Sequence, residues 1–141
     1  MKHKLLTASR RDFLKIGGSA VAAASLGMPA LATGKTGRIG FAMSTFSVPR
    51  FKHLDLPYFT EAVSAAGFET VAVQANFDAN QQLNDVNNLL AQGIDALAII
   101  AVNAGAGKNM VRKAVSEGVP VVAYNNAIPS PDLSAFVSRD N

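Results

Sequence analysis

Residues 79–102, ANQQLNDVNNLLAQGIDALAIIAV, combine the periodicities of a helix and of a buried strand in one short stretch. A helix over 79–92 is predicted by apolar residues that recur at spacings of three and four, namely Leu83, Val86, Leu89 and Leu90. Gly93 follows where a left-handed helix cap is expected. The nearly continuous apolar run 96–102 is typical of a parallel strand that is covered on both faces.

The same alternation of strand, helix and glycine extends outward in both directions. Gly67 and Gly118 stand at the ends of two further predicted helices, and a strand follows each of them. The alternation predicts an α/β fold, a three-layer, flavodoxin-like open parallel sheet with helices on both faces. The other predicted strands are 38–44, 70–75, 119–124 and a short fifth one at 135–138, and the other helices are 51–66 and 108–117.

The composition narrows the possible partners and metals. The chain has 141 residues, enough for one globular domain at most, with no Cys and two His, so we expect no disulfide, no metal site and no cofactor. The formal charge of +3 lies in the leader: residues 1–32 hold five basic residues against one acidic residue, whereas 33–141 hold eight against nine. A nucleic-acid partner is therefore not expected.

Residues 1–32 form a candidate export signal. A basic start precedes an apolar run at 16–32 that ends in the A-x-A pattern of Ala30 and Ala32, where we expect cleavage. A membrane-spanning helix is the alternative, but the run is short and interrupted by glycines, so we expect a mature protein that does not span the membrane. The segment resembles a twin-arginine export signal, through Ser9, Arg10, Arg11, Phe13, Leu14 and Lys15. This predicts the twin-arginine export machinery as a partner and a periplasmic mature protein that begins near Thr33.

The loops after the predicted strands are the candidate ligand site, because ligands of open parallel sheets bind outside the carboxyl ends of the strands. Asparagine amides and an arginine fork can pair with sugar hydroxyls, and an aromatic ring can cover the apolar face of a sugar. Asn is equally a turn former or helix cap, and Phe is often a core residue. The candidate ligand-binding residues are Phe46, Ser47, Arg50, Phe51, Asn103, Asn125 and Asn126.

Two other patterns do not support chemistry. GAGKN (105–109) is similar to a phosphate-binding loop, but Val102 and Asn109 occupy the places of the first Gly and the Ser or Thr, so a glycine-rich helix start is predicted. His53 and Asp55 do not share a helix face and are interpreted as a solvated helix start. The predicted loops hold no nucleophile, base or metal set, so we expect no catalytic residue and no enzyme.

Several segments in order resemble periplasmic sugar-binding proteins of ABC importers, of the ribose and xylose type. The resemblance lies in IGFAMSTFSVPRF (39–51), the run 74–100, GVPVVAYNN (118–126) and SRDN (138–141). In that family two α/β lobes close over a monosaccharide, and the closed form docks on a membrane permease. The resemblance implies that residues 33–141 are most of an N-terminal lobe, and we expect this chain alone to bind sugar weakly or not at all.

The resemblance also suggests roles for single residues. Arg50 and Phe51 stand where xylose-type receptors place an arginine and a stacking aromatic, and Ser47 stands near a polar contact of ribose-type receptors. Asn125 and Asn126 replace the usual Asp-Arg pair of the family. Because amides make weaker hydrogen bonds than charged groups, the expected ligand is a modified sugar or a polyol.

Three functions remain open from the sequence. The leading hypothesis is the solute-binding component of an ABC-type sugar importer. A periplasmic sugar sensor that feeds a chemoreceptor or a sensor kinase is the first alternative. A sugar-responsive transcription regulator of the same fold is less favoured, because such proteins begin with a helix-turn-helix where this chain has an export signal.

Overall fold

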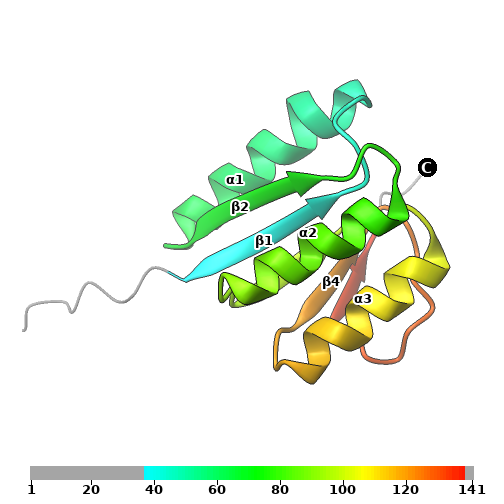
Figure 1. Cartoon of the computed structure of the whole chain (residues 1–141). Helices are drawn as coiled ribbons and strands as arrows, with labels where there is room; N and C mark the ends of the chain where they lie inside the picture. The colour runs from blue at the N-terminus through cyan, green and yellow to red at the C-terminus, as the bar shows by residue number, and fades with distance from the viewer. Residues whose placement is uncertain (1–36, 139–141) are drawn as a thin grey trace, which may run out of the picture. The chain divides into compact units, whose positions relative to one another are not determined.

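The computed structural model describes residues 37–138, which form a five-stranded, fully parallel sheet in the order β2-β1-β3-β4-β5 (Figure 1). The predicted α/β fold class is confirmed. Within this part of the chain no helix has the length and hydropathy needed to cross a bilayer. The strands are β1 (Arg38–Met43), β2 (Glu69–Gln74), β3 (Ala96–Ile99), β4 (Val121–Tyr124) and β5 (Ala135–Val137). The helices are η2 (Phe51–Asp55, a π-helix), α1 (Leu56–Ala65), α2 (Ala79–Ala91) and α3 (Ala104–Ser116).

Two apolar clusters lie on opposite faces of the sheet. Helices α2 and α3 cover one face, and α1 lies on the other (Figure 1). On the α2/α3 face, Leu97 and Ile99 of β3 pack against side chains such as Leu89 and Met110. The opposite cluster contains Phe41, whose ring centroid lies 4.3 Å from that of Phe59 on α1. Alternate residues of β1 and β3 therefore enter different clusters, as the period of two in a strand requires.

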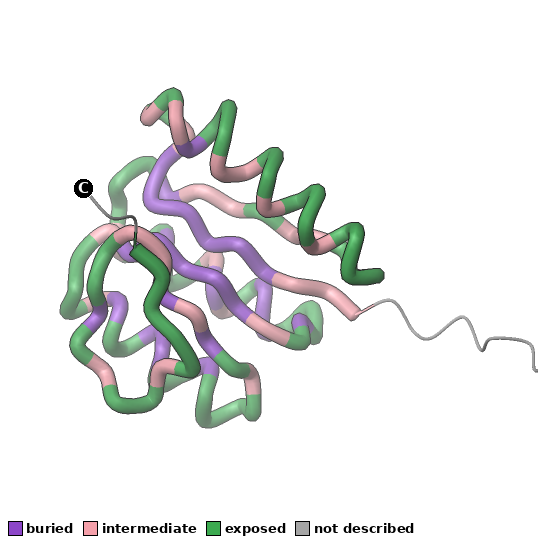
Figure 2. Tube along the Cα trace, turned by 180° about the vertical axis from the view of Figure 1, so that it is seen from behind, coloured by how far each residue is buried: buried purple, intermediate pink, exposed green. Residues whose placement is uncertain are grey.

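The α1 face is covered only in part: β1 and β3 are buried on both faces over most of their length, whereas β4 alternates between buried and half-buried residues and β5 is exposed. All three residues of β5 are exposed, and α1 has no buried residue (Figure 2). Cavities of about 430 and 370 Å³, lined mainly by apolar side chains, lie between α1 and the sheet. The connection from β4 to β5, residues 125–134, contains no helix.

The element boundaries confirm some of the predicted helix caps and strand ends and correct others. The three predicted left-handed glycine caps are confirmed, with φ of +84° at Gly67, +72° at Gly93 and +79° at Gly118. The third helix begins at Ala104 and not near residue 108, because Asn103 caps it and the glycines at its start are helical, as a glycine-rich helix start predicts. The strands predicted at 96–102 and 119–124 are shorter, ending at Ile99 and beginning at Val121 respectively.

Gln82 on α2 is a polar residue within the apolar core. It is 1% exposed, its Nε2 donates to the carbonyl of Ile100 at 2.8 Å, and its Oε1 accepts from the N–H of Val102 at 2.9 Å. The side chain thus satisfies the backbone just beyond β3, where the strand hydrogen bonds have ended. This clamp fixes the segment that leads to Asn103 at the carboxyl edge of the sheet.

Replacing Gln82 with Leu should destabilise the domain by about 2–4 kcal/mol, because one buried carbonyl and one N–H lose their only partner. Urea unfolding followed by circular dichroism measures this cost. Gln81→Leu is the matched control: Gln81 is the exposed neighbour on the same helix and its side chain bonds only Asp85 among the described residues, so its change should stay within about 0.5 kcal/mol. Equal costs for the two variants would contradict the role of the clamp.

Candidate functional site

Three of the predicted site residues meet at the carboxyl edge of the sheet. Arg50 Nη2 donates to Asn125 Oδ1 at 2.6 Å, Asn125 Nδ2 donates to Asn126 Oδ1 at 2.8 Å, and Asn126 Nδ2 donates to the carbonyl of Ala101 at 2.8 Å. The chain of hydrogen bonds joins the segments that follow β1, β4 and β3. We call Arg50, Asn125 and Asn126, with these bonds, the amide relay.

The backbone holds the relay in place. Asn125 has φ of +63°, a left-handed conformation that Asn adopts more readily than most residues. Its N–H donates to the carbonyl of Val137 at 2.8 Å, and the N–H of Asn126 donates to the carbonyl of Tyr124 at 2.7 Å. One backbone bond and two side-chain bonds of its own therefore fix Asn125, and the Asn126–Tyr124 bond spans it, so the relay is held by hydrogen bonds within the chain.

The polar side chains of Thr45 and Gln74 anchor the loop after β1. Thr45 is fully buried, and its Oγ1 accepts from the N–H of Ser47 at 2.9 Å. Gln74 Oε1, at the end of β2, accepts from the N–H of Phe46 at 2.8 Å. Ser47 itself is exposed, so its side chain is accessible from solvent at this edge.

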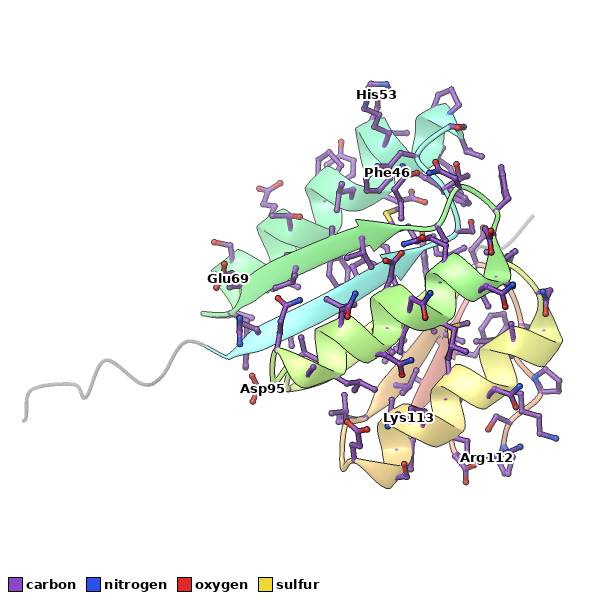
Figure 3. The ribbon with its side chains drawn as sticks, in the orientation of Figure 1. Phe46, His53, Glu69, Asp95, Arg112 and Lys113 are labelled. Atoms are coloured by element: carbon purple, nitrogen blue, oxygen red, sulfur yellow. The ribbon has the colours of Figure 1, made fainter. Side chains whose placement is uncertain are left out.

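The two candidate aromatic residues belong mainly to the core. Phe51 is 7% exposed, and the guanidinium carbon of Arg50 lies 5.0 Å from the centroid of its ring. A ring covered by Arg50 cannot offer that face to a sugar. Phe46 is half-buried and packs against the α1-side cluster. Figure 3 shows it at the carboxyl end of the sheet, far from Glu69 and Asp95 at the other end.

Asn103 serves as a helix cap. It is exposed, and its Oδ1 accepts from the N–H of Ala106 at 2.8 Å, which satisfies one of the unpaired donors at the start of α3. No described side chain joins it to the amide relay. The capping alternative weighed from the sequence is therefore correct for the side-chain oxygen of Asn103.

Asp55 is a site residue that the sequence analysis missed. Its Oδ2 lies 3.4 Å from Arg50 Nη2, and the side chains of Arg50 and Asp55 are 26% and 11% exposed. The interpretation of Asp55 as part of a solvated helix start is wrong, whereas His53 is exposed and points away from the edge (Figure 3). Asp55 follows Arg50 by five residues. Residues five apart lie on the same side of a π-helix but on different sides of an α-helix, so the α-helical periodicity assumed from the sequence did not bring them together.

The chemistry of the edge suits a polyhydroxyl compound. Arg50 Nε and Nη1 donate no hydrogen bond to any residue in 37–138, and each amide of the relay keeps a second N–H. Hydroxyl groups, which both donate and accept, match such a set. The 430 Å³ cavity is lined mostly by apolar side chains and does not match it. Among the described residues, no three His, Asp or Glu side chains cluster as metal ligands would.

Comparison with family models gives two matches. Residues 39–141 match the periplasmic binding protein domain, and residues 7–27 match the twin-arginine translocation pathway signal sequence. The predicted signal and its cleavage position lie outside the described residues. The second match confirms the identification of the signal but leaves cleavage after Ala32 a prediction.

Several known proteins are similar to this chain in sequence or in structure. It is 29% identical over 104 residues to the D-xylose-binding periplasmic protein of Escherichia coli, covering 74% of this chain and 31% of the relative. It is 34% identical over 137 residues to a xylitol-binding protein of Mycolicibacterium smegmatis, covering 90% and 38% respectively. An ABC transporter solute binding protein from Mycobacterium smegmatis, crystallised with glycerol, superposes with a TM-score of 0.68 at 31% identity, covering 75% and 36%. The chain spans about a third of the length of these curated relatives.

Two substitutions at Asn125 should separate its side-chain bonds from its backbone conformation. Asn125→Gly keeps the left-handed φ and loses the bonds to Arg50 and Asn126, at a cost of about 1–2 kcal/mol. Asn125→Ala loses the same bonds and also pays about 1–2 kcal/mol for the left-handed backbone. Urea unfolding measures both, with Asn109→Ala on the exposed side of α3 as the control. Equal stability of the Gly and Ala variants would show that the conformation carries no strain.

Proposed function

The chain belongs to the periplasmic binding protein domain family, and from this premise we propose that it forms part of a receptor that binds a monosaccharide or polyol for an ABC importer. Its twin-arginine signal sequence makes it an exported, periplasmic protein. Members of this family are solute-binding proteins, and we propose that this chain likewise binds its ligand without chemical change. The proposal extends from residues 39–141 to a receptor that is longer in the known relatives.

The single observation that carries the proposal is the amide relay. Its donors and acceptors converge at the carboxyl edge of a parallel sheet, which is the ligand-binding edge of such sheets. It is held by internal hydrogen bonds, so a ligand would meet a prebuilt surface and lose less free energy in ordering it.

The relay also favours a ligand class. Asn125 and Asn126 are uncharged, and Arg50 is paired with Asp55, so the edge presents hydroxyl-matching groups without a strong field. The related proteins named for D-xylose and xylitol, and the related structure with bound glycerol, are consistent with a small polyhydroxyl compound. We propose a linear polyol or a pentose as the ligand.

The remaining partners follow from the family and are proposals here. A receptor of two lobes is expected to close when the ligand contacts both of them, and the closed form to dock on an ABC permease in the inner membrane. Residues 33–141 on their own are therefore expected to bind weakly or not at all. The proposed domain boundary between 32 and 33 lies outside the described residues.

Replacing Arg50 with Gln should weaken ligand binding by about 10–100-fold, because a guanidinium that bonds hydroxyls is lost from the relay. The measurement is isothermal titration of the natively expressed periplasmic protein with xylitol, D-xylose and D-ribose. Arg112→Gln is the matched control, because Arg112 is exposed on α3 (Figure 3). This variant should bind the ligand as tightly as the wild type. The absence of binding of all three compounds to the wild type, or an unchanged affinity in Arg50→Gln, would contradict the proposal.

The leader gives a separate prediction. Replacing both Arg10 and Arg11 with Lys should hold the protein in the cytoplasm at full leader length, because the receptor of this pathway recognises the paired arginines. Cell fractionation with N-terminal sequencing checks this, and the exported wild type should begin near Thr33. Lys2→Arg with Lys4→Arg is the control, since it keeps the charge of the leader and leaves the pair intact. Export of the twin-lysine variant would refute the assignment.

A further inference from the structure

We infer that Asp55 determines the charge preference of the binding edge: by neutralising Arg50 it makes the edge accept uncharged polyhydroxyl compounds and reject sugar acids. This inference rests on the proposed function, and it assigns to Asp55 a role in specificity. Asp55 acts through Arg50 and is a positioning residue in this scheme.

The carboxylate side of this ion pair is shielded from solvent, whereas Arg50 is partly exposed. Asp55 Oδ2 has no exposed surface and accepts no hydrogen bond from the described residues, and it lies 3.4 Å from Arg50 Nη2. A carboxylate removed from water is costly unless a cation compensates it. Among the described residues, Arg50 is the cation that pairs with this carboxylate, so the two charges stabilise each other in the folded protein.

The π-helical segment explains how Asp55 reaches Arg50. The N–H of Leu56 donates to the carbonyl of Phe51, five residues earlier, which is the bond of a π-helix. The wider turn brings residues five apart to the same side, and Asp55 follows Arg50 by that interval. Because π-turns are rare and are frequent at functional sites, this geometry is a feature that an ordinary helix start would not supply.

Arg50 Nη2 is shared between Asp55 and Asn125, which leaves Nε and Nη1 for a ligand. The guanidinium can thus donate to hydroxyls while its charge is balanced. Other nearby charges are otherwise engaged or exposed: Asp78 caps α2 by accepting from Asn80 and Gln81, and Lys52 is exposed on η2.

The consequence for a sugar acid follows from this balance. A ligand carboxylate that approaches Arg50 would also approach the carboxylate of Asp55, which lies 3.4 Å from Arg50 Nη2. The two negative charges would repel each other. If Asp55 were neutral, Arg50 would be an uncompensated cation with two free donor groups, and such a fork binds carboxylates in a bidentate manner.

The test compares xylitol with D-xylonate, which have the same number of carbons and differ in charge. Isothermal titration of the natively expressed periplasmic protein should show that the wild type prefers xylitol. Asp55→Asn should shift the ratio of the two affinities toward xylonate by about tenfold or more, and added salt should reduce that gain.

Three further variants show that charge, and not packing, is responsible. Asp55→Glu keeps the carboxylate and should retain the preference for xylitol. Asp55→Ser removes the charge with a smaller side chain, which keeps the measurement possible if the Asn variant does not fold. Glu61→Gln removes one charge from the exposed side of α1 and should leave the ratio unchanged.

The outcomes distinguish this inference from the proposed function. If the wild type binds xylitol and neither Asp55→Asn nor Asp55→Ser changes the ratio, the role of Asp55 is refuted while the proposed function stands. If the wild type binds none of xylitol, D-xylose and D-ribose, the proposed function fails and this inference fails with it. A salt-sensitive shift in the variants without the carboxylate, absent in Asp55→Glu and Glu61→Gln, supports it.

Discussion

Exclusion of water from both faces of β1 and β3 is the constraint on which the rest of the structure depends. Phe41 and Met43 enter the cluster on the α1 side, and Leu97 and Ile99 enter the cluster on the α2/α3 side. Buried parallel strands must satisfy every backbone polar group within the sheet. Where the sheet bonds stop, Gln82 takes over beside β3 and Gln74 bonds the loop after β1. Side-chain hydrogen bonds therefore continue the order of the sheet into the loops at its carboxyl edge.

This rigidity gives the edge its chemical character. Arg50 is held between an amide and a carboxylate, so its position and its net field are set by two different neighbours, Asn125 and Asp55. The hydrogen bond with the side-chain amide of Asn125 fixes the direction of the Arg50 donors. The ion pair with Asp55 limits how strongly the edge attracts anions. A binding surface of this kind separates shape recognition from charge recognition, and each is carried by a different contact of one side chain.

Much of the fold and half of the site could be predicted from the sequence. Apolar periodicity and the three glycine caps located the helices and the central strands because burial imposes those patterns directly. The meeting of Arg50 with Asn125 followed from the rule that strand ends of a parallel sheet share one edge.

The failures have physical reasons of their own. Asp55 was missed because helical periodicity of 3.6 places residues five apart on different sides, and the π-helix changes that relation. Sequence alone does not decide between core and ligand contact for Phe51, or between cap and ligand contact for Asn103; the structure shows the core contact and the cap, and ligand contact stays a prediction. The exposure of β5 could not be predicted because its apolar sequence is also that of a buried strand.

The shallow packing of α1 has a consequence for how the domain moves. Helices α2 and α3 each bury several side chains, whereas α1 buries none and adjoins open cavities. Local opening requires less free energy where fewer apolar contacts are lost, so the amide hydrogens of α1 should exchange sooner than those of α2. The segment η2, which Arg50 precedes and Asp55 ends, leads directly into α1. Arg50 lies shortly before this helix, and Asn125 and Asn126 follow the buried strand β4, so a ligand that bridges them would reduce the local opening of α1.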